Sequence, residues 1–208
     1  GIPFGVMLAF FASAFFLQGG SADWRTVMIS VGLPGVILAL LLKFTVKEPK
    51  RTESVQTDDA EKPSVSASLK TLLKIPTWWG MALGISFGSF GNYAISTWII
   101  DYYVRAFAGL DITQLLIAFG IINGSAYALG VWLGGYIADR WGKQNKKAYA
   151  LLPAIALIIG VPALYFSLQV NDLWLSVGLM TFLLFTSGSY LGPSFAMAQT
   201  LAPINVRA

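Results

Sequence analysis

Six long stretches of this chain contain no charged residue, and their length limits the possible folds more than any other feature. They cover residues 1–22, 26–42, 75–100, 112–138, 148–171 and 173–206. A helix needs about 20 mostly apolar residues to cross the hydrocarbon core of a bilayer. Backbone groups must be satisfied inside lipid, and the alternating pattern of a membrane β-barrel is absent. We therefore predict an all-α, polytopic helical membrane protein with six transmembrane helices.

The composition agrees with this interpretation and excludes several kinds of chemistry. Of the 208 residues, 12% are charged and 56% are hydrophobic, whereas a soluble domain is about 25% charged. The chain has no cysteine and no histidine, which excludes disulfides, zinc sites built from these residues and Ser-His-Asp catalysis. No uncharged stretch can supply the carboxylates that an embedded enzyme would need. We expect no enzymatic activity, no metal site and no cofactor.

The basic residues predict which side of the membrane each connection occupies. Twelve of the 14 lysines and arginines follow the second, fourth or sixth stretch, and the other two are Arg25 and Arg105. Basic residues concentrate on the cytoplasmic side of membrane proteins. Residues 45–74 and 139–147 are therefore predicted to be cytoplasmic. The net charge of +4 reflects topology, so we expect the lipid bilayer as a partner and no nucleic acid.

The segment 45–74 is polar, contains two prolines and mixes both charge signs, which is typical of a flexible linker. At its end, residues 68–75 read SLKTLLKI. The leucines of this segment fall on one helical face and the lysines on another, as in a helix that lies on a membrane surface. A simple lead-in to the third span is the alternative.

A cluster of charge and glycine, GGYIADRWGKQNKK, separates the fourth and fifth uncharged stretches. Its glycines predict a tight turn between two spans. The cluster also fits a cytoplasmic-loop motif, G-x3-D-R-x-G-K/R, through Gly135, Asp139, Arg140, Gly142 and Lys143. This motif resembles that of the major facilitator superfamily. The family pattern continues with another base, whereas this chain has glutamine at position 144.

The order of the spans also resembles that of the major facilitator superfamily. Two spans, a long linker and four spans are similar to helices five to ten of the twelve in that superfamily. Residues 1–44 would then be the last two helices of the N-terminal bundle, residues 45–74 the inter-bundle linker, and residues 75–208 the first four helices of the C-terminal bundle. The segments DWRTVMISVGLPGVILALLLKFTVKEPKR and QTLAPINVRA are similar to spinster-like members. The abrupt beginning and end suggest a chain cut from a longer protein.

The resemblance implies a secondary active transporter of the bacterial inner membrane that works by alternating access. Its solute would be small or amphipathic, lipid-like or an organic anion, with a proton or ion as a possible coupling partner. The remaining helices of the full-length transporter would complete the fold. By the same resemblance, Asp139 and Arg140 form part of an inner gate. A non-transporting sensor or scaffold built on the same fold is the alternative.

Polar and helix-bending residues inside the spans are the candidates for solute contact. The candidates for a substrate cavity are Asn92, Tyr93, Ser96, Trp98, Asn123, Tyr127, Ser187 and Tyr190. Hydrogen bonds between helices are the alternative role for them. Gly188, Gly192 and Pro193 predict a kink or a broken turn, with a passive kink as the alternative to a gate. Asp101 and Arg105 form an interfacial ion pair or an external gate.

Overall fold

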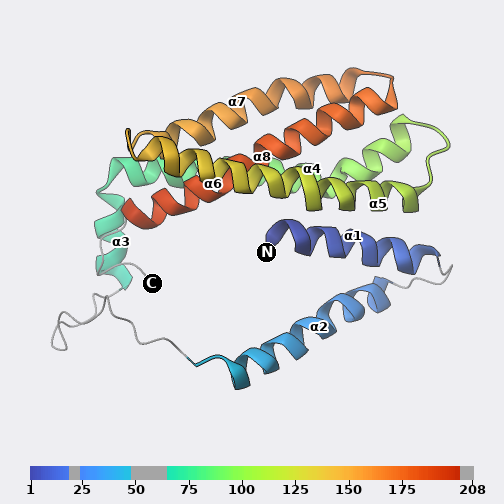
Figure 1. Ribbon diagram of the computed structural model, residues 1–208, viewed down its shortest axis with the longest axis horizontal. Helices are drawn as coiled ribbons and strands as arrows, with labels where there is room; N and C mark the ends of the chain where they lie inside the picture. The colour runs from blue at the N-terminus through green and yellow to red at the C-terminus, as the bar shows by residue number, and fades with distance from the viewer. Residues whose placement is uncertain (19–23, 48–64, 202–208) are drawn as a thin grey trace.

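The computed structural model describes residues 1–18, 24–47 and 65–201, and all regular structure in this part of the chain is helical (Figure 1). The elements are α1 (Ile2–Gln18), α2 (Trp24–Thr45), α3 (Val65–Leu73), α4 (Pro76–Ala106), α5 (Ile112–Ile122), the π-helical η2 (Asn123–Tyr127), α6 (Ala128–Gly142), α7 (Ala148–Gln169) and α8 (Leu173–Leu201). The all-α prediction is confirmed.

The six expected spans correspond to α1, α2, α4, the continuous α5–η2–α6 rod, α7 and α8. Four helical segments in the described residues are long and apolar enough to cross a membrane: Trp24–Thr45, Ile112–Gly142, Ala148–Gln169 and Leu173–Ala198. Helix α1 is equally apolar but has only 17 residues. Helix α4 has 31 residues and continues past the uncharged window 75–100, so that Asp101 and Arg105 lie in its last turns.

Helix α8 lies at the centre of the bundle and packs against α4, α6, α7 and η2. Glycines make its contact with α6 unusually close. A methyl group at Gly130 would overlap the backbone of Phe185, and one at Gly134 would overlap the backbone of Ser189. Small residues at such spacing let two membrane helices approach backbone to backbone. Gly130 and Gly134 therefore serve the packing of α6 on α8.

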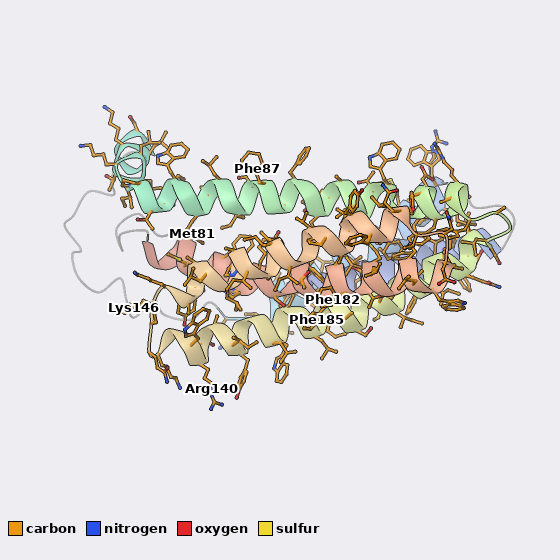
Figure 2. All side chains as sticks on the ribbon, turned by 90° about the horizontal axis from the view of Figure 1, so that it is seen from above. Met81, Phe87, Arg140, Lys146, Phe182 and Phe185 are labelled. Carbon is orange, nitrogen blue, oxygen red and sulfur yellow. The ribbon has the colours of Figure 1, made fainter. Side chains whose placement is uncertain are left out.

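The bundle has two distinct ends, which lie at opposite sides of Figure 1. We call the end with the α6–α7 turn, residues 143–147, the basic end, because Lys143, Lys146 and Lys147 lie there. We call the opposite end, with the turns at 107–111 and 170–172, the far end. Gly109 has φ +84° in the first of these turns, a conformation that favours glycine. Lys146 and Arg140 lie together at one end in Figure 2.

The far end contains a cluster of deeply buried side chains around Tyr103. Tyr103 of α4 is 0% exposed and its ring packs beside those of Phe107 and Phe119. Its hydroxyl lies 2.9 Å from the Ser176 hydroxyl, which donates to the Ser167 carbonyl over 2.7 Å. These bonds join α4, α8 and α7 at one point.

Helices α1 and α2 lie on one side of this bundle (Figure 1). Helix α1 packs against α5 and η2, with Met7 and Phe11 in the spaces that Gly124 and Gly120 leave open. Helix α2 packs against α1 and has no buried residue. Its apolar side chains therefore face outward on nearly all sides.

The structure contradicts two expectations about glycine and proline. The tight turn predicted between the two spans occurs at residues 143–147, but the glycines do not form it. Gly134, Gly135 and Gly142 are helical, and the only positive-φ glycine of the described residues is Gly109. The predicted broken turn in the last span is also wrong, because α8 is helical through Pro193. Proline has no N–H to offer the carbonyl four residues earlier, and that carbonyl, of Ser189, faces Gly134 instead.

A helix does occur at the end of the linker, but it covers Val65–Leu73, not residues 68–75. Pro76 occupies the first turn of α4, where its missing N–H is tolerated. The rest of the linker, at 48–64, lies outside the described residues.

Candidate functional site

The motif residues lie in the second half of α6, from Gly135 onward, and in the turn that follows it at the basic end. Asp139, Arg140 and Gly142 are helical, and Lys143 caps the helix. Asp139 accepts a hydrogen bond from the Tyr149 hydroxyl of α7 over 2.9 Å. Arg140 donates to the hydroxyl of Tyr136, one turn earlier, over 3.2 Å.

The two glycines of the motif have different surroundings. A methyl group at Gly142 would overlap the Tyr149 ring, whereas one at Gly135 would meet no atom within 4 Å. The two positions therefore differ in how much a larger side chain would disturb them.

Four of the eight cavity candidates come together near the middle of the bundle. Tyr127 of η2 is close enough to Asn92 and Tyr190 to interact with them electrostatically, and Tyr93, also in range, is 75% exposed. The Tyr190 ring of α8 packs against Gly88 of α4, where a Cβ atom would lie 3.2 Å away. Three helical segments thus contribute one cluster of hydroxyl and amide groups, which we call the central polar cluster.

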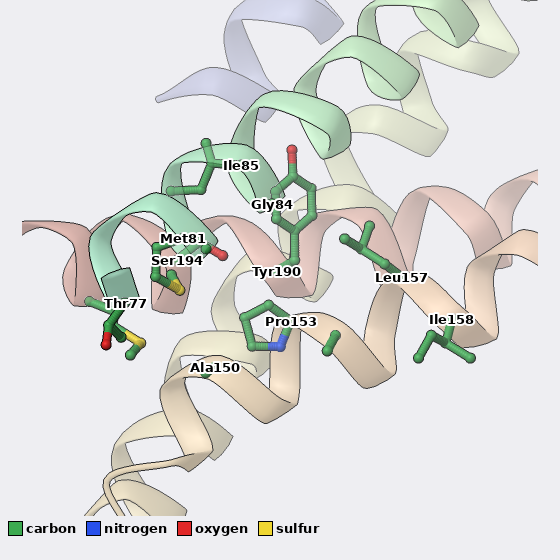
Figure 3. A pocket seen from close by; sticks show the side chains of 13 residues that line it. Thr77, Met81, Gly84, Ile85, Ala150, Pro153, Leu157, Ile158, Tyr190 and Ser194 are labelled. Atoms are coloured by element: carbon green, nitrogen blue, oxygen red, sulfur yellow. The ribbon is translucent and has the colours of Figure 1, made fainter. Parts of the chain in front are cut away.

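A cavity of about 530 Å³ extends from this cluster toward the basic end, between α4, α7 and α8. Tyr190 lies at its inner limit, between Gly84 of α4 and Leu157 of α7 (Figure 3). Thr77 and Ser194 add two further hydroxyl groups. The remaining lining is apolar and comprises Gly80, Met81, Gly84, Ile85, Ala150, Pro153, Ala154, Leu157, Ile158 and Met197. Such a lining suits a solute that is mostly apolar with a few polar groups.

Of the eight cavity candidates, only Tyr190 lines this cavity. Four of the others lie outside the central polar cluster as well. Ser96 is exposed and donates to the Tyr93 carbonyl of its own helix over 3.0 Å. Asn123 donates to the Phe119 carbonyl, also in its own rod, over 2.9 Å. Ser187 is buried in α8. Trp98 is exposed beside a second cavity of about 400 Å³.

That second cavity also contains the Asp101–Arg105 pair. The closest nitrogen and oxygen are 4.0 Å apart and both side chains are largely exposed. An exposed pair of this spacing contributes about 0.3–0.5 kcal/mol, so the geometry favours the interfacial ion pair over a gate. Of the glycine and proline candidates, Gly188 packs on the Tyr127 backbone, Gly192 has open space and Pro193 is buried.

Sequence reasoning missed several features of this region. The π-helical turn at Asn123–Tyr127 has no distinctive sequence pattern, although such turns often occur at functional sites. Thr77, Met81 and Ser194 were missed because single small or apolar residues are common in membrane helices. Tyr149 was missed because it lies outside the motif. In the described residues, no three acidic, cysteine or histidine side chains are grouped as a metal site.

Comparisons with known proteins identify the family. The family model of the major facilitator superfamily matches residues 1–208. An MFS-type efflux pump of Mycolicibacterium smegmatis is 25% identical, over 91% of this chain and 44% of its own length. Protein spinster homolog 1 of Xenopus tropicalis is 29% identical, over 73% of this chain and 31% of its own length.

A solved structure has the same fold. It is a bacterial homologue of the human lysosomal transporter spinster, in an inward-facing, unoccupied conformation, with a TM-score of 0.68 and 21% identity. The match covers 98% of this chain and 47% of that one. The chain belongs to the major facilitator superfamily and is an integral membrane protein. Its expected resemblance to spinster-like members is confirmed, and it spans less than half the length of these relatives.

Proposed function

We propose that the full-length protein is a secondary active transporter that moves a small or amphipathic organic solute by alternating access. The observation that supports this most is the cavity of about 530 Å³ that ends at Tyr190. It combines an apolar lining with hydroxyl groups at both ends, inside a bundle of the transporter superfamily. Apolar walls with a few fixed polar groups favour a lipid-like solute or an organic anion with a large apolar part.

The same proposal includes an orientation in the membrane. The basic end faces the cytoplasm, because three lysines and Arg140 lie there, whereas the described residues of the opposite side have two basic residues, Arg105 and, at the start of α2, Arg25. The bacterial inner membrane is the proposed location. The motif residues Asp139 and Arg140 then belong to an inner gate, whose partner lies in a helix beyond this chain.

The test is solute flux through the full-length protein in liposomes. Two fluorescent probes, a single-chain lipid and an aromatic organic anion, are offered to loaded and to empty vesicles. We expect saturable flux of at least one probe above the protein-free background. Asp139→Asn should slow this flux while the protein still inserts at the normal level, because the carboxylate acts at the gate and not in the span.

A membrane sensor or scaffold remains the second candidate function. It is distinguished by equilibrium binding of the same two probes to the detergent-solubilised protein. Tight binding without flux of either probe or of a wider solute panel would contradict transport and support the sensor. Flux without any effect of Asp139→Asn would contradict the gate and leave the motif with a topological role.

A further inference from the structure

Tyr149 is the only described side chain that bonds to the carboxylate of the motif. Its hydroxyl lies 2.9 Å from Oδ1 of Asp139, and the two residues belong to successive helices joined by the turn at 143–147. Within the described residues, no lysine or arginine nitrogen lies within 4.0 Å of that carboxylate. Arg140, the adjacent motif residue, bonds to Tyr136 instead. Among the described residues, the hydrogen-bond partner of Asp139 is thus a phenol and not a basic side chain.

Gly142 provides the space that this contact needs. A Cβ atom at Gly142 would overlap the Tyr149 ring, so only glycine at this position lets the ring lie across the end of α6. The ring contact and the hydrogen bond come from the same side chain. Together they fix where the tyrosine hydroxyl reaches Asp139.

We propose that Tyr149 is a positioning residue for Asp139 and competes for its carboxylate with the gate partner in a helix beyond this chain. This proposal rests on the proposed transport function. A carboxylate oxygen that accepts from Tyr149 is directed toward α7 and is less available to a donor elsewhere. Both groups are exposed, so the bond can be exchanged for water or another donor at small cost. Such an exchange suits a contact that forms and breaks once in each transport cycle.

The test is a double-mutant cycle in the full-length protein, with solute flux as the first measurement. Tyr149→Phe removes the hydroxyl and keeps the ring, and Gly142→Ala displaces the ring. We expect each to change the maximal flux in the same direction. In an Asp139→Asn background, Tyr149→Phe should produce no further change, because the tyrosine acts through the carboxylate.

The matched control is Tyr165→Phe, on the same helix. Tyr165 is 59% exposed and its ring meets Phe166. This change should leave flux at the wild-type level. If Tyr149→Phe behaves like Tyr165→Phe, or if its effect adds to that of Asp139→Asn, the proposal is overturned.

Hydrogen exchange provides a measurement that does not depend on transport. Losing the bond between α6 and α7 should speed amide exchange in the turn at 143–147, because local opening becomes easier. Tyr149→Phe should show this increase and Tyr165→Phe should not. If the wild-type protein moves no solute, the proposed function fails, and exchange rates still decide whether Tyr149 holds this turn. Unchanged exchange would contradict the contact itself.

Discussion

At each end of the bundle a tyrosine hydroxyl forms a hydrogen bond to a neighbouring helix, but one bond is buried and the other is exposed. At the far end, Tyr103 is fully buried and its bond to Ser176 continues to the α7 backbone. At the basic end, Tyr149 bonds to Asp139 where both side chains are reached by solvent. A buried hydrogen bond is expensive to break because its groups are left unsatisfied, whereas an exposed one is replaced by water. The tyrosine bond at the far end is therefore costlier to break than the one at the basic end.

The largest effect should follow from removing the buried tyrosine ring. Tyr103→Ala should destabilise the full-length protein by about 3–5 kcal/mol, the usual cost of truncating a buried aromatic residue. Thermal unfolding in detergent measures this change. Tyr165→Ala, at an exposed position of α7, serves as the control. Equal losses from the two variants would show that the far end is not the stable region.

A second comparison uses two adjacent glycines of α6. Gly134→Ala places a methyl group against the Ser189 backbone, and overpacking of this kind costs about 1–3 kcal/mol. Gly135→Ala meets open space, so its unfolding temperature should stay close to that of the wild type. A larger loss of stability from Gly135→Ala than from Gly134→Ala would contradict the close α6–α8 contact.

The hydroxyl groups of the two tyrosines test the comparison directly. Tyr103→Phe should destabilise the protein by about 1 kcal/mol, because it removes a buried hydrogen bond. Tyr149→Phe should leave the unfolding temperature nearly unchanged, even though it is expected to alter flux. The pair is measured by the same unfolding assay, and a larger loss from Tyr149→Phe would reverse the assignment of the two ends.

The smallest effect is expected at the exposed ion pair. Asp101→Asn should cost no more than about 0.3–0.5 kcal/mol, and added salt should remove the difference from the wild type. Unfolding at low and high ionic strength measures it. A salt-independent loss above 1 kcal/mol would be evidence that the pair has a gating or structural role.

Much of this arrangement could be predicted from the sequence, because long uncharged windows have few solutions in lipid. The all-α class, the order of the spans and the position of the motif between two of them followed directly. Glycine was harder to interpret, since it serves both tight turns and close helix contacts. At Gly134 only the neighbouring helix α8 decides between the two roles, and the residue that it contacts there, Ser189, is 55 residues further along the chain.

The candidate site could be predicted only in part, for the same reason. Asn92, Tyr93 and Tyr190 share polarity with Ser96 and Asn123, but only the first three lie within electrostatic range of Tyr127. The other two satisfy their side chains on their own helices. The π-helical turn at Asn123–Tyr127 shifts the register of the rod. The direction in which the side chains beyond it point can therefore not be predicted from an ideal α-helical period.

The proposed gate depends on which end of the bundle faces the cytoplasm. Cysteine labelling measures this orientation most directly. This chain has no cysteine, so a single one at position 146 or 171 is its only reactive thiol. In intact cells with any other cysteines of the protein replaced, Asn171→Cys should react with a membrane-impermeant maleimide. Lys146→Cys should react only after the membrane is permeabilised. Labelling of position 146 in intact cells would contradict the orientation and the cytoplasmic gate with it.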